Sequence, residues 1–588
     1  MRILGINCGG HDTSAALIIN GKLVCAFEEE RFNKEKHSKK FPIKSIRECL
    51  KFSKLKISDI DRIALSTDPK RQIRKFWLEE AIKNDHGLKK FIDEFKLIKK
   101  WYDLENFIKK KLGYDGIFNY YKHHLNHLSS CYFPSNFKKS LVVSFDGVGE
   151  GETGYMAIGQ KNKFKIIHDK NVFPNSLGLL YAAVTSYLGW RYASDEGIIM
   201  ALASYGNPKK KIPKKNKTYI QVFREIISSQ NNLDLNINKN WISYHRERDT
   251  WVSEKFIKTF GKRRLYKNKL TQHHKNIAAA LQLRLEEIVL SQLKYLKNKY
   301  KVKKLCLSGG VALNCSMNGK IAKSKIFDKI FVQPASGDAG LAIGAAINCS
   351  LDVEPKKKLI FDTNCYLGSR YSKEFIKKTI KKYKNRVQIV KYKDYYDFAS
   401  EVLIKKKIIG WFQGSAEFGP RALGNRSILA LPSSVKMRDK INRKVKFREI
   451  FRPFAPAILE EFSSKYFDIN QESEHMLIAF KVKPKMKKYI PATVHVDNTS
   501  RVQTVNINSN RKFYKLLKSI EQKSGVPVLL NTSFNIKGQP IVNSPDDAIM
   551  CFLKYNIDYL FIDDFILKKT IGDFMLKKTT VRKNYPLL

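Results

Sequence analysis

The sequence predicts an α/β protein of at least two domains. Its 588 residues exceed what one hydrophobic core usually supports, and 43% hydrophobic with 28% charged residues is a globular composition. Two segments of the N-terminal half share one rhythm, in which an apolar strand is followed by an Asp-containing turn and a hairpin. A third segment passes from an apolar strand through two glycines into a helix. These observations favour a duplicated α/β domain followed by a second α/β domain.

The first repeat spans residues 3–32, ILGINCGGHDTSAALIINGKLVCAFEEERF. An apolar strand runs into Gly-Gly-His-Asp, and a second strand, SAALII, follows. Asn20-Gly21 is a strong signal for a two-residue hairpin turn, which leads into a third strand, KLVCAF. Residues 140–168 repeat this order: a strand ends on Asp146-Gly147 and is followed by a Gly-rich turn and alternating strands. We therefore expect two related units that both end a strand on Asp.

The third unit, KKLCLSGGVALNCSMNGKI (303–321), is a strand, then Ser308-Gly309-Gly310, then the start of a helix. Apolar residues at helical spacing over 276–300 predict a long helix before it, packed on the sheet. Two strand–Asp–hairpin units with a strand–Gly–Gly–helix unit resemble the actin-like (ASKHA-type) ATPase core. In that core the Asp-bearing turns face each other across a cleft, and the Gly-Gly turn lets the backbone approach a nucleotide.

The domain boundary is predicted near LDVEPKKKL (351–359), where a Pro and a run of charge follow a small-residue helix. The first domain would cover residues 1–355, with a Lys- and Asn-rich insertion at about 207–272 that shows few core signals. A fresh α/β pattern begins after the boundary, so the second domain would cover 360–588.

Charge and cysteine usage limit the classes of partner. The net charge of +54 suggests nucleic acid, but most basic residues are Lys and are spread along the whole chain, so no specific nucleic-acid partner is expected. No apolar run approaches the roughly 18 residues of a membrane span, and 178–190 is predicted to be a buried helix. Nine scattered cysteines without a C-x-x-C pair, and an N-terminus without a secretory signal, favour a cytoplasmic protein with no membrane partner.

Two histidines in KHHLNH (122–127) indicate a metal site. His123 and His127 are four residues apart, so on a helix their imidazoles share one face, about 5–6 Å apart at Cβ. Asp146 ends the strand of the second repeat, and Asp338 lies in a Gly-flanked turn in QPASGDAGLAIG. If the cleft closes as in actin-like folds, these four residues meet. Two imidazoles and two carboxylates suit Fe(II), Mn(II) or Zn(II), whereas the alternative is a polar helix face without a metal.

The motifs together resemble the O-carbamoyltransferase family, which includes nodulation-factor and antibiotic carbamoyltransferases. In the N-terminal half they are GGHDTSAALI, EEERFNKEKH, HHLNHLSS, SFDGVGEGET, LSGGVALNCSMNGK and QPASGDAG. In the C-terminal half they are WFQGSAEFGPRALGNRSILA, VKFREIFRPFAPAI, SRVQTV and LLNTSFNIKGQPIV. The resemblance spans nearly the whole chain.

The resemblance implies two domains with separate chemistry. The C-terminal domain would be YrdC-like and would form carbamoyl adenylate from carbamoyl phosphate and ATP, with Mg(II) as a companion of the nucleotide. The N-terminal domain, with Fe(II) or alternatively Zn(II) or Mn(II), would transfer the carbamoyl group to a hydroxyl. The acceptor would be a small molecule or glycan, such as a sugar or secondary metabolite. A homodimer is left open.

The family motifs also assign site residues. The metal ligands would be His123, His127, Asp146 and Asp338. His11 or Asp12 would deprotonate the acceptor hydroxyl, and Lys36 would neutralise a phosphate. The residues that lie against the adenylate would be Gly309, Gly310 and Asn314. Carbamoyl phosphate and ATP would be bound by Arg421, Lys446, Arg448, Arg452, Arg501, Asn531 and Ser533. The alternative for the five cations is a Lys-rich surface, but four of them are Arg in a Lys-dominated chain, which favours a binding role.

One stretch departs from the family pattern. In EGIIMALASYG (196–206), Ile198 stands where a Lys is expected, Ala201 where a Gly is expected and Ser204 where a Pro is expected. The change bears on the choice of acceptor. Two other functions stay open: a transferase that makes threonylcarbamoyl-adenosine in tRNA, and a non-catalytic regulator that binds nucleotide and metal.

Overall fold

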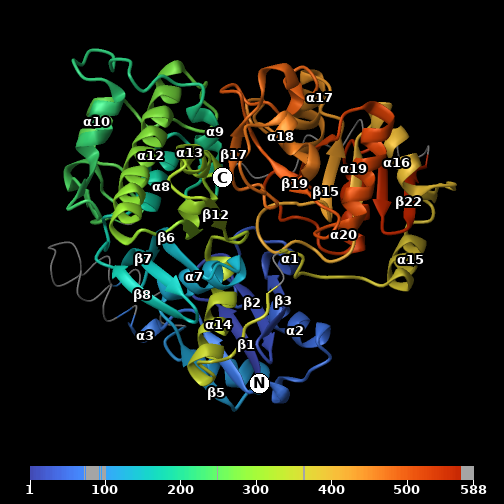
Figure 1. The fold of residues 1–588 in the computed structure, drawn as a ribbon, viewed down its shortest axis with the longest axis horizontal. Coiled ribbons are helices and arrows are strands. Elements are labelled where there is room, and N and C mark those ends of the chain that lie inside the picture. The colour runs from blue at the N-terminus through green and yellow to red at the C-terminus, as the bar shows by residue number, and fades with distance from the viewer. Residues whose placement is uncertain are drawn as a thin grey trace. The chain divides into compact units, whose positions relative to one another are not determined.

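A computed structural model describes residues 1–71, 73, 92, 95, 101–247, 249–361 and 364–570. The chain divides into two compact units (Figure 1). The first comprises Met1–Asn33 and His37–Thr363, and the second comprises Lys34–Lys36 and Asn364–Leu588.

The first unit contains two five-stranded sheets with the same topology. The strand order of one sheet is β3 (Lys22–Glu28), β2 (Ser14–Ile19), β1 (Arg2–Asn7), β4 (Arg62–Leu65) and β5 (Ile117–Tyr120). The order of the other is β8 (Lys163–His168), β7 (Glu152–Gln160), β6 (Lys139–Gly149), β11 (Lys304–Ser308) and β12 (Lys329–Val332). In each, an antiparallel meander is extended by two strands parallel to its first strand. This repeated order is the duplicated actin-like arrangement that the sequence predicts.

Two helices pack against the sheets and against each other. Helix α7 (His123–Tyr132) packs on β6, β7 and β11, whereas α14 (Leu341–Val353) packs on β1, β2 and β4. Gly344 makes the close approach of α14 to α7 possible, because a Cβ there would lie 2.0 Å from the carbonyl oxygen of Asn126. The start of α7, the end of β6 and the turn before α14 therefore come together where the two repeats meet.

A helical layer covers part of the second sheet. It consists of α8 (Leu177–Tyr187), α9 (Glu196–Ala203), α10 (Tyr219–Ile226), α12 (Gln272–Tyr300) and α13 (Cys315–Ser324). Helix α8 packs on β6, but the main contacts of α12 are with α9, α10 and α13, so the prediction that it packs on the sheet is wrong. Residues 278–280 of α12 are buried alanines, and their short side chains let other helices approach closely.

The Lys- and Asn-rich region around 207–272 is folded and has its own buried aromatic residues. Besides α10 it contains the hairpin β9–β10 (Ile227–Gln230, Asp234–Ile237) and α11 (Glu254–Phe260). Phe223, Trp241 and Phe256 are each 3% exposed or less. A few buried aromatic residues therefore form a core in this region, which its Lys- and Asn-rich composition did not indicate. The other α-helices in the described part of the first unit are α1 (Glu30–Asn33), α2 (Ile43–Phe52), α3 (Pro69–Arg71) and α6 (Leu104–Leu112).

The second unit is built on an eight-stranded mixed sheet. The strand order is β13 (Val387–Ile389), β22 (Phe565–Lys569), β21 (Tyr559–Ile562), β14 (Ile409–Phe412), β15 (Arg426–Ala430), β20 (Val528–Ser533), β16 (Ala455–Leu459) and β19 (Gln503–Val505). Phe412 belongs to one core, with α15 (Lys373–Lys382) and α20 (Pro545–Lys554), and its neighbour Trp411 to the other, with α16 (Tyr395–Ile404) and α19 (Arg511–Ser524). Alternating strand residues thus fill two separate cores.

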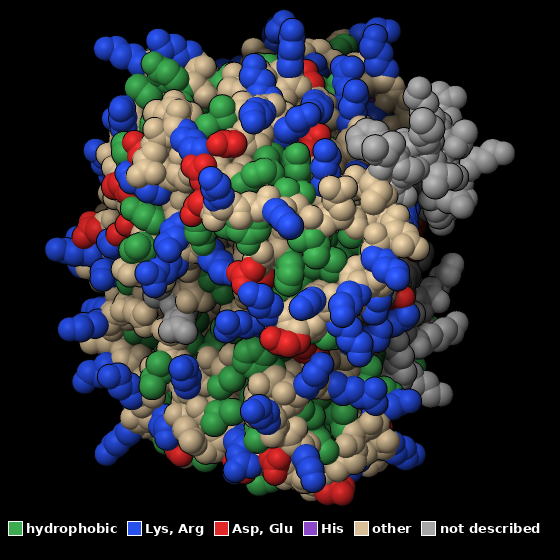
Figure 2. Space-filling view, turned by 90° about the vertical axis from the view of Figure 1, so that its right-hand side faces the viewer, with side chains coloured by type: hydrophobic (Ala, Val, Ile, Leu, Met, Phe, Trp, Pro, Cys, Tyr) green, Lys and Arg blue, Asp and Glu red, His purple; other side chains and the backbone are tan. Residues whose placement is uncertain are grey.

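Smaller elements complete the second unit. They are α17 (Val435–Ile441), the turn Asn442–Lys446, α18 (Ser463–Tyr466), and the two-stranded sheet of β17 (Ala479–Lys481) and β18 (Thr499–Arg501). The nine cysteines are all free and buried. Within the described part of the chain, no helix has the length and apolar character to cross a bilayer. Basic side chains are scattered across the face shown in Figure 2 and do not form one stripe.

Candidate functional site

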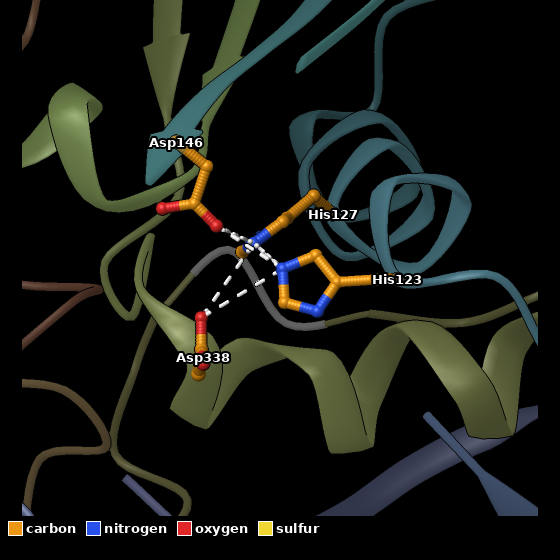
Figure 3. Close-up of side chains that lie close together, drawn as sticks. All are labelled: His123, His127, Asp146 and Asp338. Atoms are coloured by element: carbon orange, nitrogen blue, oxygen red, sulfur yellow. Dashed lines mark hydrogen bonds and ion pairs between the residues drawn. The ribbon is translucent and has the colours of Figure 1, made fainter. Parts of the chain in front are cut away.

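Four side chains from three parts of the first unit converge on one point (Figure 3). His123 and His127 extend from the first turns of α7, Asp146 from β6, and Asp338 from the turn Asp338–Gly340 that precedes α14. His123 Nε2, His127 Nε2 and Asp146 Oδ2 are 3.1 Å from one another. Asp338 Oδ1 lies 3.9 Å from His123 Nε2 and 3.8 Å from His127 Nε2.

These distances suit a divalent cation. Ligand atoms bonded at about 2.1 Å and about 90° apart lie about 3 Å from each other, as three of these four atoms do. Three of the four residues are buried, with His127 fully enclosed and His123 and Asp146 at most 8% exposed, and Asp338 is half-buried. Two carboxylates withdrawn from water need positive charge nearby, and the nitrogen and oxygen donors match Fe(II), Mn(II) or Zn(II). The residues therefore fit the metal that the sequence predicts.

The neighbouring backbone fixes Asp146. Its Oδ1 accepts a hydrogen bond from the Gly310 N–H at 2.9 Å, and its carbonyl accepts one from Ser176 Oγ at 2.9 Å. Gly309 has φ +82°, and a Cβ there would lie 2.2 Å from the carbonyl oxygen of Phe145. The Gly-Gly turn therefore approaches β6 as closely as only glycine permits, and it orients the Asp146 carboxylate.

The three adjacent histidines have different environments. Burial alone would lower the pKa of His123, but the hydrogen bond to Asp146 and the charge of Asp338 raise it to about 9. For His124, burial and then the charges of His123 and His127 lower the pKa to about 3, so this imidazole is neutral at pH 7. His124 Nδ1 lies 3.1 Å from Ser144 Oγ, away from the four converging side chains.

His11 and Asp12 lie in the loop between β1 and β2, and Asp146 lies within β6, which continues to Gly149, so the prediction that both repeats end a strand on Asp is wrong. His11 Nδ1 is 2.9 Å from Asp12 Oδ2, and His11 Nε2 is 3.8 Å from Asp338 Oδ2. Burial would lower the pKa of His11, but the charge of Asp338 and the hydrogen bond to Asp12 raise it to about 10. His11 thus borders the four-residue cluster, whereas Lys36 is exposed and groups with the second unit.

Asn314 has a structural role in the described contacts. Its Oδ1 accepts from the Met317 N–H and caps α13, while its Nδ2 donates to Gln282 Oε1 at 2.8 Å. Ile198 is 2% exposed within α9, so the position where the family has Lys is part of the apolar interior. That position therefore supplies no charge to the site.

The predicted anion-binding residues of the second unit lie around the end of β20. Lys446 is 3% exposed, and its Nζ donates to the carbonyl and Oγ of Ser533 and to the carbonyl and Oδ1 of Asn535, at 2.6–3.1 Å. Burial, followed by the charge of Arg448, lowers the pKa of Lys446. Asn531 donates to Gln503 Oε1 at 2.9 Å, and its own buried Oδ1 has no partner among the described residues.

Three arginines add positive charge to this cluster. Burial and the charges of Arg452 and Arg501 act to lower the pKa of Arg448, whose guanidinium lies 4.4 Å from the Phe454 ring centre. Arg452 is 3.7 Å from Glu449, a carboxylate that also accepts from Lys537 at 2.7 Å. Cations outnumber carboxylates here, which favours an anionic ligand.

The loop that carries Arg421 is organised by two buried charges that sequence reasoning missed. Glu417 is 2% exposed, and its Oε1 accepts from the N–H groups of Leu423, Asn425 and Arg426 at 2.7–3.1 Å. Arg426 is fully buried 3.6 Å from the Phe412 ring centre and donates to four carbonyl oxygens. Both residues lie in EFGPRALGNRS. A charged residue near each end of this Gly-rich loop was the sequence feature that could have indicated their role.

The fold and the two clusters define a duplicated actin-like unit with a candidate metal site, joined to an α/β unit with a buried basic cluster. Residues 2–347 match the family model described as carbamoyltransferase N-terminus, and residues 400–569 match carbamoyltransferase C-terminus. The chain belongs to the carbamoyltransferase family and is a carbamoyltransferase enzyme.

Relatives extend over most of the chain. Nodulation protein NolNO of Sinorhizobium fredii is 35% identical over 95% of this chain and 79% of its own length. Nodulation protein U of the same species is 26% identical over 97% and 99%. An uncharacterized protein of Methanocaldococcus jannaschii is 34% identical over 96% and 99%.

Solved structures match more distantly. Component A of the Acidaminococcus fermentans (R)-2-hydroxyglutaryl-CoA dehydratase is 13% identical, with a TM-score of 0.31, over 59% of this chain and 97% of its own. The ROK hexokinase of Thermus thermophilus is 13% identical, with a TM-score of 0.28, over 60% and 100%. The fold assignment therefore depends on the strand order of the two sheets.

Proposed function

We propose that this carbamoyltransferase works in two steps, one in each unit. In the second unit, water releases phosphate from carbamoyl phosphate, and an oxygen of the resulting carbamate attacks the α-phosphorus of ATP, which gives carbamoyl adenylate and pyrophosphate. In the first unit, the carbamoyl group passes to a hydroxyl of a small molecule or glycan, such as a sugar or secondary metabolite. The observation that carries the proposal is the convergence of His123, His127, Asp146 and Asp338 beside His11.

The basic cluster supports the first step. Carbamoyl phosphate is a small dianion, and the adenylate forms only if two anions are held together against their repulsion. Arg448, Arg452 and Arg501 supply charge for this purpose, while Lys446 holds the end of β20 through Ser533. Asn531 Oδ1, buried and without a partner among the described residues, can accept a hydrogen bond from the carbamoyl NH₂.

The pair His11–Asp12 supports the second step. Both oxygens of Asp12 already contact imidazoles, so His11 is the better candidate for the base. Because its pKa is about 10, His11 first gives its own Nε2 proton to water. The Nε2 of the neutral imidazole then takes the proton of the acceptor hydroxyl as the new O–C bond forms, and the bond between the carbamoyl carbon and the AMP phosphate oxygen breaks. A bound Fe(II), Zn(II) or Mn(II), held by the two histidines and two aspartates, would supply Lewis-acid stabilisation of negative charge.

Pyrophosphate release from ATP in the presence of carbamoyl phosphate tests the first step. Arg501→Gln should slow release at least about tenfold, because one charge-assisted hydrogen bond to substrate phosphate is worth about 1.5–3 kcal/mol. Arg511→Gln, at the exposed start of α19, removes the same charge elsewhere and should leave the rate unchanged. Release that never occurs, or that both variants retain equally, would refute the proposed adenylation.

The metal is tested separately. Iron, zinc and manganese in the purified chain are quantified for wild type and for Asp338→Asn, which keeps the shape but removes one anionic ligand. We expect one metal ion per chain in wild type and a large loss in the variant. Equal metal content in both would contradict the proposed ligand set.

A further inference from the structure

His37 lies beside the His11–Asp12 pair and has no part in the steps above. Its Nδ1 is 2.8 Å from Asp12 Oδ1, while the other oxygen of Asp12 is 2.9 Å from His11 Nδ1. The three side chains form one continuous chain, His37–Asp12–His11. Its far end, His11 Nε2, lies 3.8 Å from Asp338 Oδ2 at the border of the candidate metal site.

The backbone around His37 is held in place from several directions. Glu30 Oε2 accepts from the His37 N–H at 2.7 Å. Thr13 N–H donates to the Ser38 carbonyl at 3.2 Å, and Thr13 Oγ1 donates to the Lys40 carbonyl at 2.7 Å, so the two loops are joined directly. These bonds fix the loop of His37 to the loop of His11.

Asp12 and His37 both have a left-handed backbone, with φ +54° and +56°. Asp, Asn and His adopt this region more often than other residues that carry a side chain. The conformation limits which substitutions position 37 tolerates, because Gly and Asn adopt it most readily.

The contact has a clear mechanical consequence. A carboxylate that accepts from an imidazole at each oxygen cannot rotate without breaking one bond. Burial alone would raise the pKa of Asp12, but the hydrogen bonds and charges of His11 and His37 hold it well below its usual range. Asp12 therefore stays ionised and keeps the Nδ1–H of His11, which leaves the Nε2 lone pair of a neutral His11 for the acceptor.

We propose that His37 is a positioning residue for carbamoyl transfer, which fixes Asp12 and through it the ring orientation and tautomer of His11. The inference rests on the proposed function, in which His11 Nε2 takes the acceptor proton. In this role His37 acts through Asp12 and is not one of the four candidate metal ligands His123, His127, Asp146 and Asp338. Its removal should affect the transfer step and spare pyrophosphate release, which belongs to the second unit.

The test compares His37→Asn with His37→Gly. Both residues tolerate the left-handed backbone, but only Asn offers an N–H near the place of Nδ1. Transfer is measured as the labelled carbamoyl ester formed from labelled carbamoyl phosphate, ATP and glycerol, a simple hydroxyl probe. In His37→Gly we expect kcat to fall about tenfold or more with the KM for carbamoyl phosphate unchanged, as for other orienting contacts.

Two rescues distinguish positioning from a general structural role. His37→Asn should keep kcat within a few fold of wild type, and added imidazole should restore part of the rate in His37→Gly alone. Thermal unfolding and metal content should be equal in the two variants. Equal losses in both variants, or a wild-type rate in His37→Gly, would overturn the inference.

A second measurement does not depend on turnover. In spectra of the full chain with nitrogen-15 histidine, the His11 Nδ1–H signal is assigned by its absence in His11→Gln. We expect faster exchange of this proton with water in His37→Gly than in wild type, and unchanged exchange would overturn the inference. If wild type released no pyrophosphate, the proposed function would fail, and this measurement would still decide whether His37 acts on His11.

Discussion

Gly149, the last residue of β6, lies against the His123 ring, and an alanine there tests how tightly the candidate metal site is packed. A Cβ at position 149 would lie 2.2 Å from both Cγ and Cδ2 of His123 and 2.7 Å from its Nδ1. Contacting carbon atoms stay about 3.5–4.0 Å apart, so either the ring or the hairpin must move by more than about 1 Å.

Whether the His123 ring or the hairpin moves decides whether Gly149→Ala weakens metal binding or lowers stability. Overpacking costs about 1–3 kcal/mol, and every 1.4 kcal/mol or so corresponds to a tenfold change in an equilibrium constant. His123 Nε2 lies 3.1 Å from both His127 Nε2 and Asp146 Oδ2, so a displaced ring leaves the ligand set. We expect Gly149→Ala to lower the affinity for Fe(II) about 10–100-fold. If the hairpin moves instead, the metal-free chain loses a similar free energy of unfolding.

Two measurements separate these outcomes. Anaerobic competition with a chromophoric chelator gives the Fe(II) affinity, and urea unfolding of the metal-free chain gives its stability. Gly147→Ala is the matched control in the same hairpin, because its Cβ would meet only Leu179 Cδ2, at 3.8 Å. Wild-type affinity together with wild-type stability in Gly149→Ala, or an equal loss in Gly147→Ala, would refute the packing argument.

Three further predictions concern pH and buried charge. Because the pKa of metal-free His123 is raised to about 9, Fe(II) must displace a proton from it, so the affinity for Fe(II) should rise about tenfold per pH unit between pH 7 and 9. Competition titrations in which the affinity does not change with pH would contradict this. Burial would raise the pKa of Glu449, but Lys537 lowers it to about 2, so the ionised carboxylate contributes about 2–3 kcal/mol of stability above pH 4.5, and this contribution is lost as the pH falls toward 2. Urea unfolding should show that Glu449→Gln is less stable than wild type at pH 7 and that the difference becomes smaller in acid. A difference in stability that does not change with pH would count against the ion pair. Arg426→Lys should lower the free energy of unfolding by about 3 kcal/mol or more, because a single nitrogen cannot reach the carbonyls that are spread along the planar guanidinium, and some of these buried carbonyls lose their donor. Arg438→Lys should change it by less than about 0.5 kcal/mol, and equal stability of these two variants would refute the reasoning.

The duplicated sheets were predictable because their signals are local. An apolar strand, Asn20-Gly21 and a second strand specify a hairpin wherever they occur, and both residues of this turn have positive φ. The parallel partners β4, β5, β11 and β12 were not predictable in the same way. Their pairing joins residues as far apart as 141 and 305, and no short motif specifies which parallel strands become neighbours.

In the candidate site, too, the features with a local sequence signal were predictable and those that depend on tertiary contacts were not. The spacing of His123 and His127 places two nitrogens on one helix face before any tertiary structure is known. By contrast, His37 reaches Asp12 across 25 residues, and Gly149 limits His123 through a close approach that composition does not reveal. Contacts of this kind depend on how loops pack. Asn314 has a local role that its residue type did not reveal, because it caps α13, and its contact with the adenylate stays a prediction.

The two oxygens of Asp146 connect features that the sequence presents as separate motifs. Oδ2 faces the two imidazoles, whereas Oδ1 is held by the N–H of Gly310 in the Gly-Gly turn. In the proposed mechanism this turn lies against the adenylate, so nucleotide and metal would share one carboxylate between them. A shift of the turn would change the direction in which Asp146 presents its second oxygen. The adenylate site and the metal site are therefore expected to respond to each other, and a ligand at one should alter the affinity of the other.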